Sequence, residues 1–210
     1  DFVSGHLDLA KRTGASIIYG PNAEATLDFH KAKDGELFQL GDISITLLHT
    51  PGHTMESSCF LLKDDENKNH CVFTGDTLFV GDVGRPDLAV KAGHITQEDL
   101  AGYLFDSIHT KLMPLEDNVI VFPGHGAGSA CGKNIGTEMS STIGEQKQTN
   151  YALQDISKDK FIEEVTNGLL APPSYFFTDV SMNKNGYEDI DEVLDRNLNP
   201  MTYTDIIKAQ

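Results

Sequence analysis

The sequence is poor in basic residues and lacks several features of other protein classes. Lysine and arginine number 16 against 32 aspartate and glutamate residues, which gives a net charge of −16. A nucleic-acid-binding protein would need a basic stripe, so that class is excluded. No hydrophobic run approaches the roughly 18 residues that a membrane-spanning helix needs, and no signal peptide is visible. We therefore expect neither a nucleic-acid partner nor a membrane association.

Cysteine is also scarce. Cys59, Cys71 and Cys131 are an odd number of thiols with no paired spacing. This pattern argues against a disulfide scaffold and favours a reducing, cytoplasmic location. By default each of the three is a small buried residue. Internal repeats are absent too, and the 210 residues suffice for one sizeable core with or without an appendage.

Hydrophobic periodicity predicts an α/β protein. Helices are expected at 3–14, 96–113, 145–154 and 157–170, and Thr96 and Ser157 are typical capping residues. Strands are expected at 16–20, 36–50 (two strands around a tight turn), 57–64, 69–76 and 117–126. The proline- and asparagine-rich stretch 171–191 is interpreted as an extended segment, followed by a short helix.

Three glycine-containing loops directly follow predicted strands, and each holds a potential metal ligand. They are HTPGHTMESS (49–58) with His53, FTGDTLFVGDVGRPD (73–87) with Asp76, and VFPGHGAGSACGK (121–133) with His125. Loops after strands are where sheets present functional groups. Glycine allows tight turns and close approach of a ligand, and imidazole and carboxylate bind first-row metals. The other six histidines have no such context and are interpreted as structural.

Taken together, TPGHT, TGDTLF and PGHG resemble three metal-ligand loops of the metallo-β-lactamase superfamily, in order and spacing. The first motif of that superfamily, H-x-H-x-D-H, precedes a helix, and the opening DFVSGHLDLA resembles its tail. Asp1 corresponds to the aspartate, and Phe2 replaces the last histidine. The resemblance covers residues 1–170 and implies an αββα sandwich. The leading histidines and the N-terminal strands would lie upstream of residue 1, so we expect an exposed apolar sheet face here.

Within the superfamily, the runs GDTLFVGDVGRPDL and PGHGAGSACGKNIG resemble the persulfide dioxygenase branch. They are most similar to bacterial proteins in which this domain precedes a rhodanese domain. Residues 171–210 resemble the linker of those proteins, although no rhodanese active-site loop is present. The resemblance implies a rhodanese partner, in the same or another chain, and a homo-oligomer.

Phe2 bears on the number of metal ions. Hydrolases of the superfamily commonly hold two zinc ions, and the second uses the histidine that Phe2 replaces. A mononuclear site with an upstream histidine, His53 and Asp76 is therefore favoured, and two histidines with one carboxylate form the triad of Fe(II) oxygenases. The resemblance implies that Fe(II) and O₂ oxidise a low-molecular-weight persulfide, such as glutathione persulfide, to sulfite and thiol. Zinc can replace iron in purified material.

Four further residues receive roles. His125 and Asp1 are expected to orient ligands or water, with capping of the following helix as the alternative for Asp1. Arg85 is expected to pair with a substrate carboxylate, and Cys131 to bind or relay persulfide sulfur unless it is an inert buried thiol. The alternative partners of Arg85, in a structural salt bridge, are Asp82 and Asp87.

Two other functions stay open. The first is a dinuclear zinc thioester hydrolase of the glyoxalase II kind, against which Phe2 argues. The second is a non-catalytic sulfur carrier for a rhodanese domain, against which the intact His53 and Asp76 argue. The identity of the acceptor thiol, whether glutathione, coenzyme A or another, does not follow from the sequence.

Overall fold

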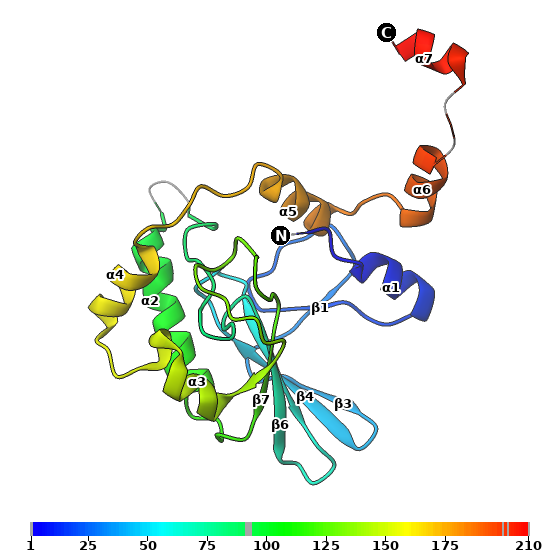
Figure 1. Ribbon diagram of the computed structural model, residues 1–210. Helices are drawn as coiled ribbons and strands as arrows, with labels where there is room; N and C mark the ends of the chain where they lie inside the picture. Colours follow the sequence, from blue (N-terminus) through cyan, green and yellow to red (C-terminus); the bar gives the residue numbers. More distant parts are fainter. Residues whose placement is uncertain (1, 91–93, 199, 201, 210) are drawn as a thin grey trace.

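A six-stranded sheet forms the centre of the computed structural model, which describes residues 2–90, 94–198, 200 and 202–209 (Figure 1). Its strands, in spatial order, are β3 (Leu37–Leu40), β4 (Ile43–His49), β5 (Ser58–Lys63), β6 (Asn69–Gly75), β7 (Ile120–Pro123) and β8 (Ser141–Thr142). Neighbouring strands are antiparallel except β6 and β7, which are parallel. Strands β1 (Ile18–Tyr19) and β2 (His30–Lys31) form a separate parallel pair. The predicted α/β class is confirmed.

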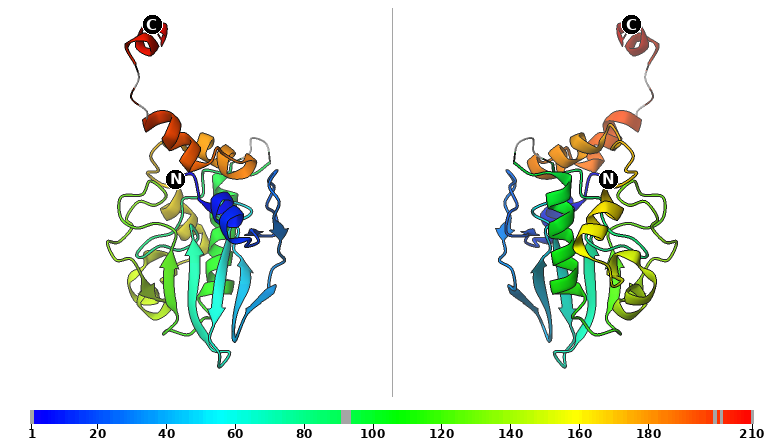
Figure 2. Two further views of the ribbon diagram at one scale, coloured as in Figure 1. Left: turned by 90° about the vertical axis from the view of Figure 1, so that its right-hand side faces the viewer. Right: turned by 90° about the vertical axis from the view of Figure 1, so that its left-hand side faces the viewer.

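Helices precede, connect and follow these strands. They are α1 (His6–Thr13), α2 (Gln97–Ser107), α3 (Ile143–Thr149), α4 (Lys158–Thr166), α5 (Phe176–Asn185), α6 (Ile190–Leu198) and α7 (Tyr203–Ala209). Figure 2 shows α2 on one side of the sheet and α1 on the other. Both predicted N-caps are confirmed, because the side chains of Thr96 and Ser157 accept hydrogen bonds from the third residue of α2 and of α4, respectively.

The main core lies between the sheet and α2. Alternate strand residues such as Leu61, Val72 and Val121 pack with Leu104 and Ile108 of the helical layer, because side chains on a strand alternate between its two faces. The opposite face carries the three paired residues Phe60, Phe73 and Phe122. Phe73 and Phe122 are 43% and 38% exposed and stack with ring centroids 5.6 Å apart. The expected exposed apolar face is therefore present.

The expectation of an extended segment at 171–191 is wrong over α5. This helix is rich in asparagine, serine and threonine, which have weak helix propensity. Burial stabilises it instead, because Phe176 is only 7% exposed and packs with Phe79 and Cys131.

The short helix expected next is α6. It buries no residue, and Figure 1 shows α6 and α7 projecting from the rest of the fold. The division into domains 1–170 and 171–210 stays a prediction. Among the described helices, none is long and apolar enough to cross a membrane.

Candidate metal centre

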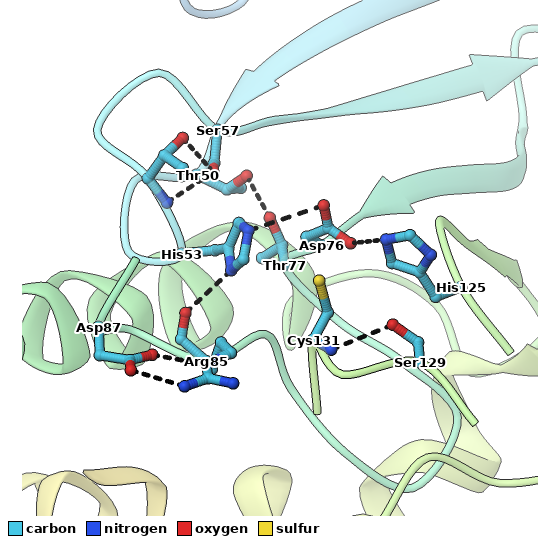
Figure 3. Close-up of polar contacts among 11 residues, drawn as sticks. Thr50, His53, Ser57, Asp76, Thr77, Arg85, Asp87, His125, Ser129 and Cys131 are labelled. Atoms are coloured by element: carbon cyan, nitrogen blue, oxygen red, sulfur yellow. Dashed lines mark hydrogen bonds and ion pairs between the residues drawn. The ribbon is translucent and has the colours of Figure 1, made fainter. Parts of the chain in front are cut away.

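The three predicted ligand loops meet at one edge of the sheet. Strand β4 is antiparallel to β5, which is antiparallel to β6, so β4 and β6 run in the same direction. Strand β7 is parallel to β6, so the carboxyl ends of all three lie at the same edge. His53, Asp76 and His125 follow these three ends and converge there (Figure 3).

Asp76 lies between the two histidines. Its Oδ2 is 3.7 Å from His53 Nε2, and its Oδ1 is 2.9 Å from His125 Nε2. Burial by itself raises the pKa of Asp76, but the contact with His125 and the charges of both imidazoles outweigh burial and hold this pKa below its ordinary value. Asp76 is therefore a carboxylate at neutral pH.

The orientation of the His53 ring follows from its second contact. Its Nδ1 lies 2.9 Å from the backbone carbonyl oxygen of Arg85. A carbonyl can only accept a hydrogen bond, so Nδ1 is the donor in this contact and Nε2 is the nitrogen that faces Asp76. This carbonyl fixes the imidazole in the orientation that a metal ligand needs.

The donor atoms at this edge suit a bound cation. Asp76 Oδ1 is buried and accepts no well-aligned hydrogen bond, although His125 Nε2 lies 2.9 Å away. A buried carboxylate oxygen without a hydrogen bond is costly unless a cation neutralises it. One donor atom each of His53, Asp76 and Cys131 lies within 4.8 Å of the others. Nitrogen, oxygen and sulfur donors in this arrangement fit a first-row metal ion.

Two aromatic rings flank His125. The Phe2 ring meets it edge-on, with centroids 5.7 Å apart and an interplanar angle of 81°. The Phe79 ring is tilted against it, with centroids 5.9 Å apart and an interplanar angle of 56°. An apolar ring therefore stands beside His125, as expected if Phe2 replaces a metal-binding histidine. Asp1 lies outside the described residues, and the histidine expected upstream lies outside the chain.

Cys131 is buried close to His53 and Asp76. It is 1% exposed and packs with Phe79 and Phe176. Burial, assisted by the charge of Asp76, raises the pKa of the Cys131 thiol to about 11. The thiol is therefore protonated at neutral pH, and its assigned role in binding or relaying sulfur stays a prediction. All three cysteines are buried thiols.

Arg85 does not present its guanidinium to the centre. Nε and Nη2 each donate to the Asp87 carboxylate at 2.7 Å, and further donors reach the carbonyls of Ala130 and Leu170. Figure 3 shows the guanidinium turned away from Asp76. The alternative salt bridge with Asp87 is thus the contact that Arg85 makes, and these bonds use four of the five N–H groups of the buried guanidinium. Arg85 serves the centre through its backbone carbonyl instead.

Two contacts that the sequence did not indicate hold the loops together. Asp82 Oδ2 accepts hydrogen bonds from the backbone N–H groups of Lys133 and Asn134, both at 2.6 Å, and so joins the second loop to the third. The hydroxyls of Thr50 and Thr77, 2.9 Å apart, join the first loop to the second. An acidic residue between glycines was a local signal for Asp82, but its partners are about 50 residues away in the chain.

A cavity of about 360 Å³ opens beside His53 and Asp76. Part of its wall comes from α5, through Phe176, Val180 and Lys184. The same three residues line an adjoining outer cavity of about 590 Å³. The centre is thus reached through a pocket that can hold a small molecule.

Comparison with known sequences identifies the family. The profile of the metallo-beta-lactamase superfamily matches residues 2–125. An uncharacterized protein of Mycobacterium tuberculosis is 39% identical over 151 residues, which is 71% of this chain and 57% of that protein. Hydroxyacylglutathione hydrolase GloC of Haemophilus influenzae is 34% identical over 138 residues, covering 65% and 54%. The chain spans a little over half the length of these curated relatives.

Comparison with solved structures gives the same fold. A metallo-beta-lactamase from Staphylococcus aureus subsp. aureus COL superposes with a TM-score of 0.80 and 35% identity, over 90% of this chain and 56% of that one. ETHE1 from Myxococcus xanthus superposes with a TM-score of 0.69 and 27% identity, over 87% and 71%. The described sheet and its helices therefore have the expected architecture.

Proposed function

The chain belongs to the metallo-β-lactamase superfamily, and on this premise we propose that it is a mononuclear iron persulfide dioxygenase. The reaction is RSSH + O₂ + H₂O → RSH + SO₃²⁻ + 2H⁺, in which the outer sulfur loses four electrons to O₂ and the S–S bond is broken. Bound Fe(II) would supply the site at which the persulfide sulfur and O₂ meet. A rhodanese partner and a homo-oligomeric state belong to the same proposal.

The main support for a single metal ion is the position of Phe2. A second metal ion beside His125 would need another donor at this place, and the chain offers an apolar ring instead. His53 and Asp76 remain for one ion, together with the expected upstream histidine. The structural similarity to ETHE1, a persulfide dioxygenase, supports the same branch.

The chain's own residues prepare the pocket for a small thiol. Phe79 and Phe176 keep water from the inner side of the centre, where Cys131 would lie against the outer sulfur. Since Arg85 is occupied, we assign the contact with the substrate carboxylate to Lys184, which lines both cavities. Lys184 Nζ is 3.3 Å from Glu56 Oε1 in a partly exposed ion pair. Such a pair is weak enough for a substrate to displace.

A thioester hydrolase of the hydroxyacylglutathione hydrolase kind is the second candidate. The similarity to GloC favours it. This function would require a second metal ion beside His125, next to the ring of Phe2. A sulfur carrier without metal, the third candidate, is disfavoured by the convergence of His53 and Asp76.

Metal analysis and turnover of the same sample decide between these functions. The protein, including the residues upstream of Asp1, is purified anaerobically, and we expect one iron per chain and persulfide-dependent O₂ uptake with release of sulfite. Two zinc ions per chain with hydrolysis of S-lactoylglutathione would refute the proposal. Absence of any bound metal would favour the sulfur carrier.

A substitution at Phe2 tests the link between this residue and the metal count. In Phe2→His a new imidazole lies next to His125, and we expect the stoichiometry to rise toward two metal ions per chain. Phe2→Leu is the matched control, because it changes the shape but adds no donor, and should stay at one. An unchanged count in Phe2→His would remove the main support for a mononuclear site.

A further inference from the structure

The side chain of Asn183 in α5 holds the start of the chain at two points. Its Oδ1 accepts a hydrogen bond from the backbone N–H of Ser4 at 2.8 Å, and its Nδ2 donates to the backbone carbonyl of Phe2 at 3.0 Å. Figure 1 shows the N-terminus lying against α5. Both ends of one amide are therefore used to fix the backbone between Phe2 and Ser4.

Contacts continue from this backbone to the metal centre. The ring of Phe2 lies edge-on against His125, with centroids 5.7 Å apart. His125 Nε2 in turn lies 2.9 Å from Asp76 Oδ1. We propose that Asn183 is a positioning residue for the metal centre, which sets the orientation of the Asp76 carboxylate through Phe2 and His125.

The surroundings of Phe2 explain why such an anchor is needed. Its side chain is 57% exposed, so burial does not fix the ring. Phe2 lies outside any helix or strand, since α1 begins only at His6. The two bonds from Asn183 thus restrict a segment that precedes the first helix and whose leading side chain is exposed.

Helix α5, which carries Asn183, is itself attached to the rest of the fold near both of its ends. Its first residue, Phe176, is 7% exposed and packs with Phe79 and Cys131 inside the fold. Near its end, the carbonyl of Lys184 accepts a hydrogen bond from the backbone N–H of Thr26 at 2.9 Å. Asn183 lies between these attachments, so its position is fixed relative to the centre.

Cobalt binding by the full-length protein tests this role directly. Co(II) is titrated into the metal-free Asn183→Ala variant, and its visible absorption bands report the ligand geometry. Loss of a group bonded directly to a metal ligand typically weakens metal binding about 10- to 100-fold. Asn183 acts from two contacts further away, so we expect a loss of roughly threefold to tenfold and altered cobalt bands.

The matched control is Asn185→Ala, on the same helix. The amide of Asn185 is exposed and donates to Ser181 Oγ at 3.2 Å, away from the start of the chain. This variant should bind Co(II) within about twofold of the wild type. Circular dichroism of each variant shows whether it is folded. If Asn183→Ala does not fold, Asn183→Asp replaces it, since it keeps the acceptor for Ser4 and loses the donor to Phe2.

A double-mutant cycle tests the proposed route through Phe2. If Asn183 acts through that ring, adding Asn183→Ala to Phe2→Ala should change Co(II) affinity by less than about twofold, because the two effects are not independent. Multiplicative effects, or a folded Asn183→Ala variant that binds Co(II) like the wild type, would overturn the inference. The readout requires a metal site but no particular reaction, so it is unaffected if the centre hydrolyses thioesters instead.

Discussion

Gly84 leaves no room for a side chain, and a single added methyl group should damage the metal centre. In Gly84→Ala the new Cβ would lie 1.8 Å from the carbonyl oxygen of Asp76 and 3.1 Å from His53 Nδ1. A carbon and an oxygen that are not bonded approach to about 3.3 Å. The backbone of residue 84 or of Asp76 must therefore move by about 1 Å or more.

The size of the effect follows from what the methyl group meets. Its neighbour is the backbone of the residue that carries the carboxylate, so no flexible side chain can move aside. Overpacking of this kind costs about 1–3 kcal/mol of folding free energy. A displacement of about 1 Å in a catalytic constellation costs on the order of 100-fold in rate. We expect metal affinity to fall by about 10- to 100-fold, as when a supporting group is lost.

Two measurements on one pair of variants check this reasoning. Urea unfolding of the metal-free protein gives the change in stability, and Co(II) titration gives the change in affinity. The control is Gly102→Ala in α2, whose Cβ would meet the flexible far end of Lys158 at 3.2 Å and Ile162 Cδ1 at an ordinary 3.8 Å. It should gain about 0.5–1 kcal/mol from helix propensity and bind metal normally. A Gly84→Ala protein that unfolds and binds Co(II) like the wild type would refute this description of the site.

Two further predictions concern buried groups around the centre. Asp82→Asn replaces an acceptor of several backbone hydrogen bonds with an amide whose NH₂ faces those donors. Urea unfolding should therefore show that the free energy of unfolding falls by about 2–4 kcal/mol. In the control variant Asp65→Asn, whose side chain is exposed, it should stay within about 0.5 kcal/mol of the wild type. Burial raises the thiol pKa values of Cys59 and Cys131 to about 11. Both thiols should therefore react slowly with iodoacetamide at about pH 8 in the folded protein. Rapid labelling of both would contradict this expectation. The unfolded thiols ionise near their ordinary value of 9.0, so the stability that they contribute is present below pH 9 and should decline toward pH 11.

The features that the sequence predicts best are those determined locally. The cap at Thr96 needs only Asp99 three residues later, and the structure contains that reciprocal pair. The metal loops were recognisable because strand, glycine and ligand are adjacent in the chain. Their convergence then required only that β4, β6 and β7 end at one edge of a sheet.

Arg85 shows where local reasoning ends. The sequence offered two neighbouring aspartates and a substrate as its partners, and nothing local chooses among them. The choice depends on the carbonyls of Ala130 and Leu170, which the fold brings from 45 and 85 residues away to complete the site around the guanidinium. Once those acceptors are present, the guanidinium is buried and paired with Asp87.

Helix α5 shows the same limit for a whole element. Its composition indicated an extended linker. The helix is instead stabilised by the burial of Phe176 against Phe79 and Cys131, which the composition does not reveal. A contact of this kind produces no hydrophobic periodicity in the sequence, because one buried ring is enough to anchor a helix of ten residues. This observation distinguishes two parts of residues 171–210: α5 contributes Phe176 and Lys184 to the wall of the pocket, whereas α6 buries none of its residues. The part of the chain with the weakest sequence pattern therefore forms part of the metal centre's surroundings.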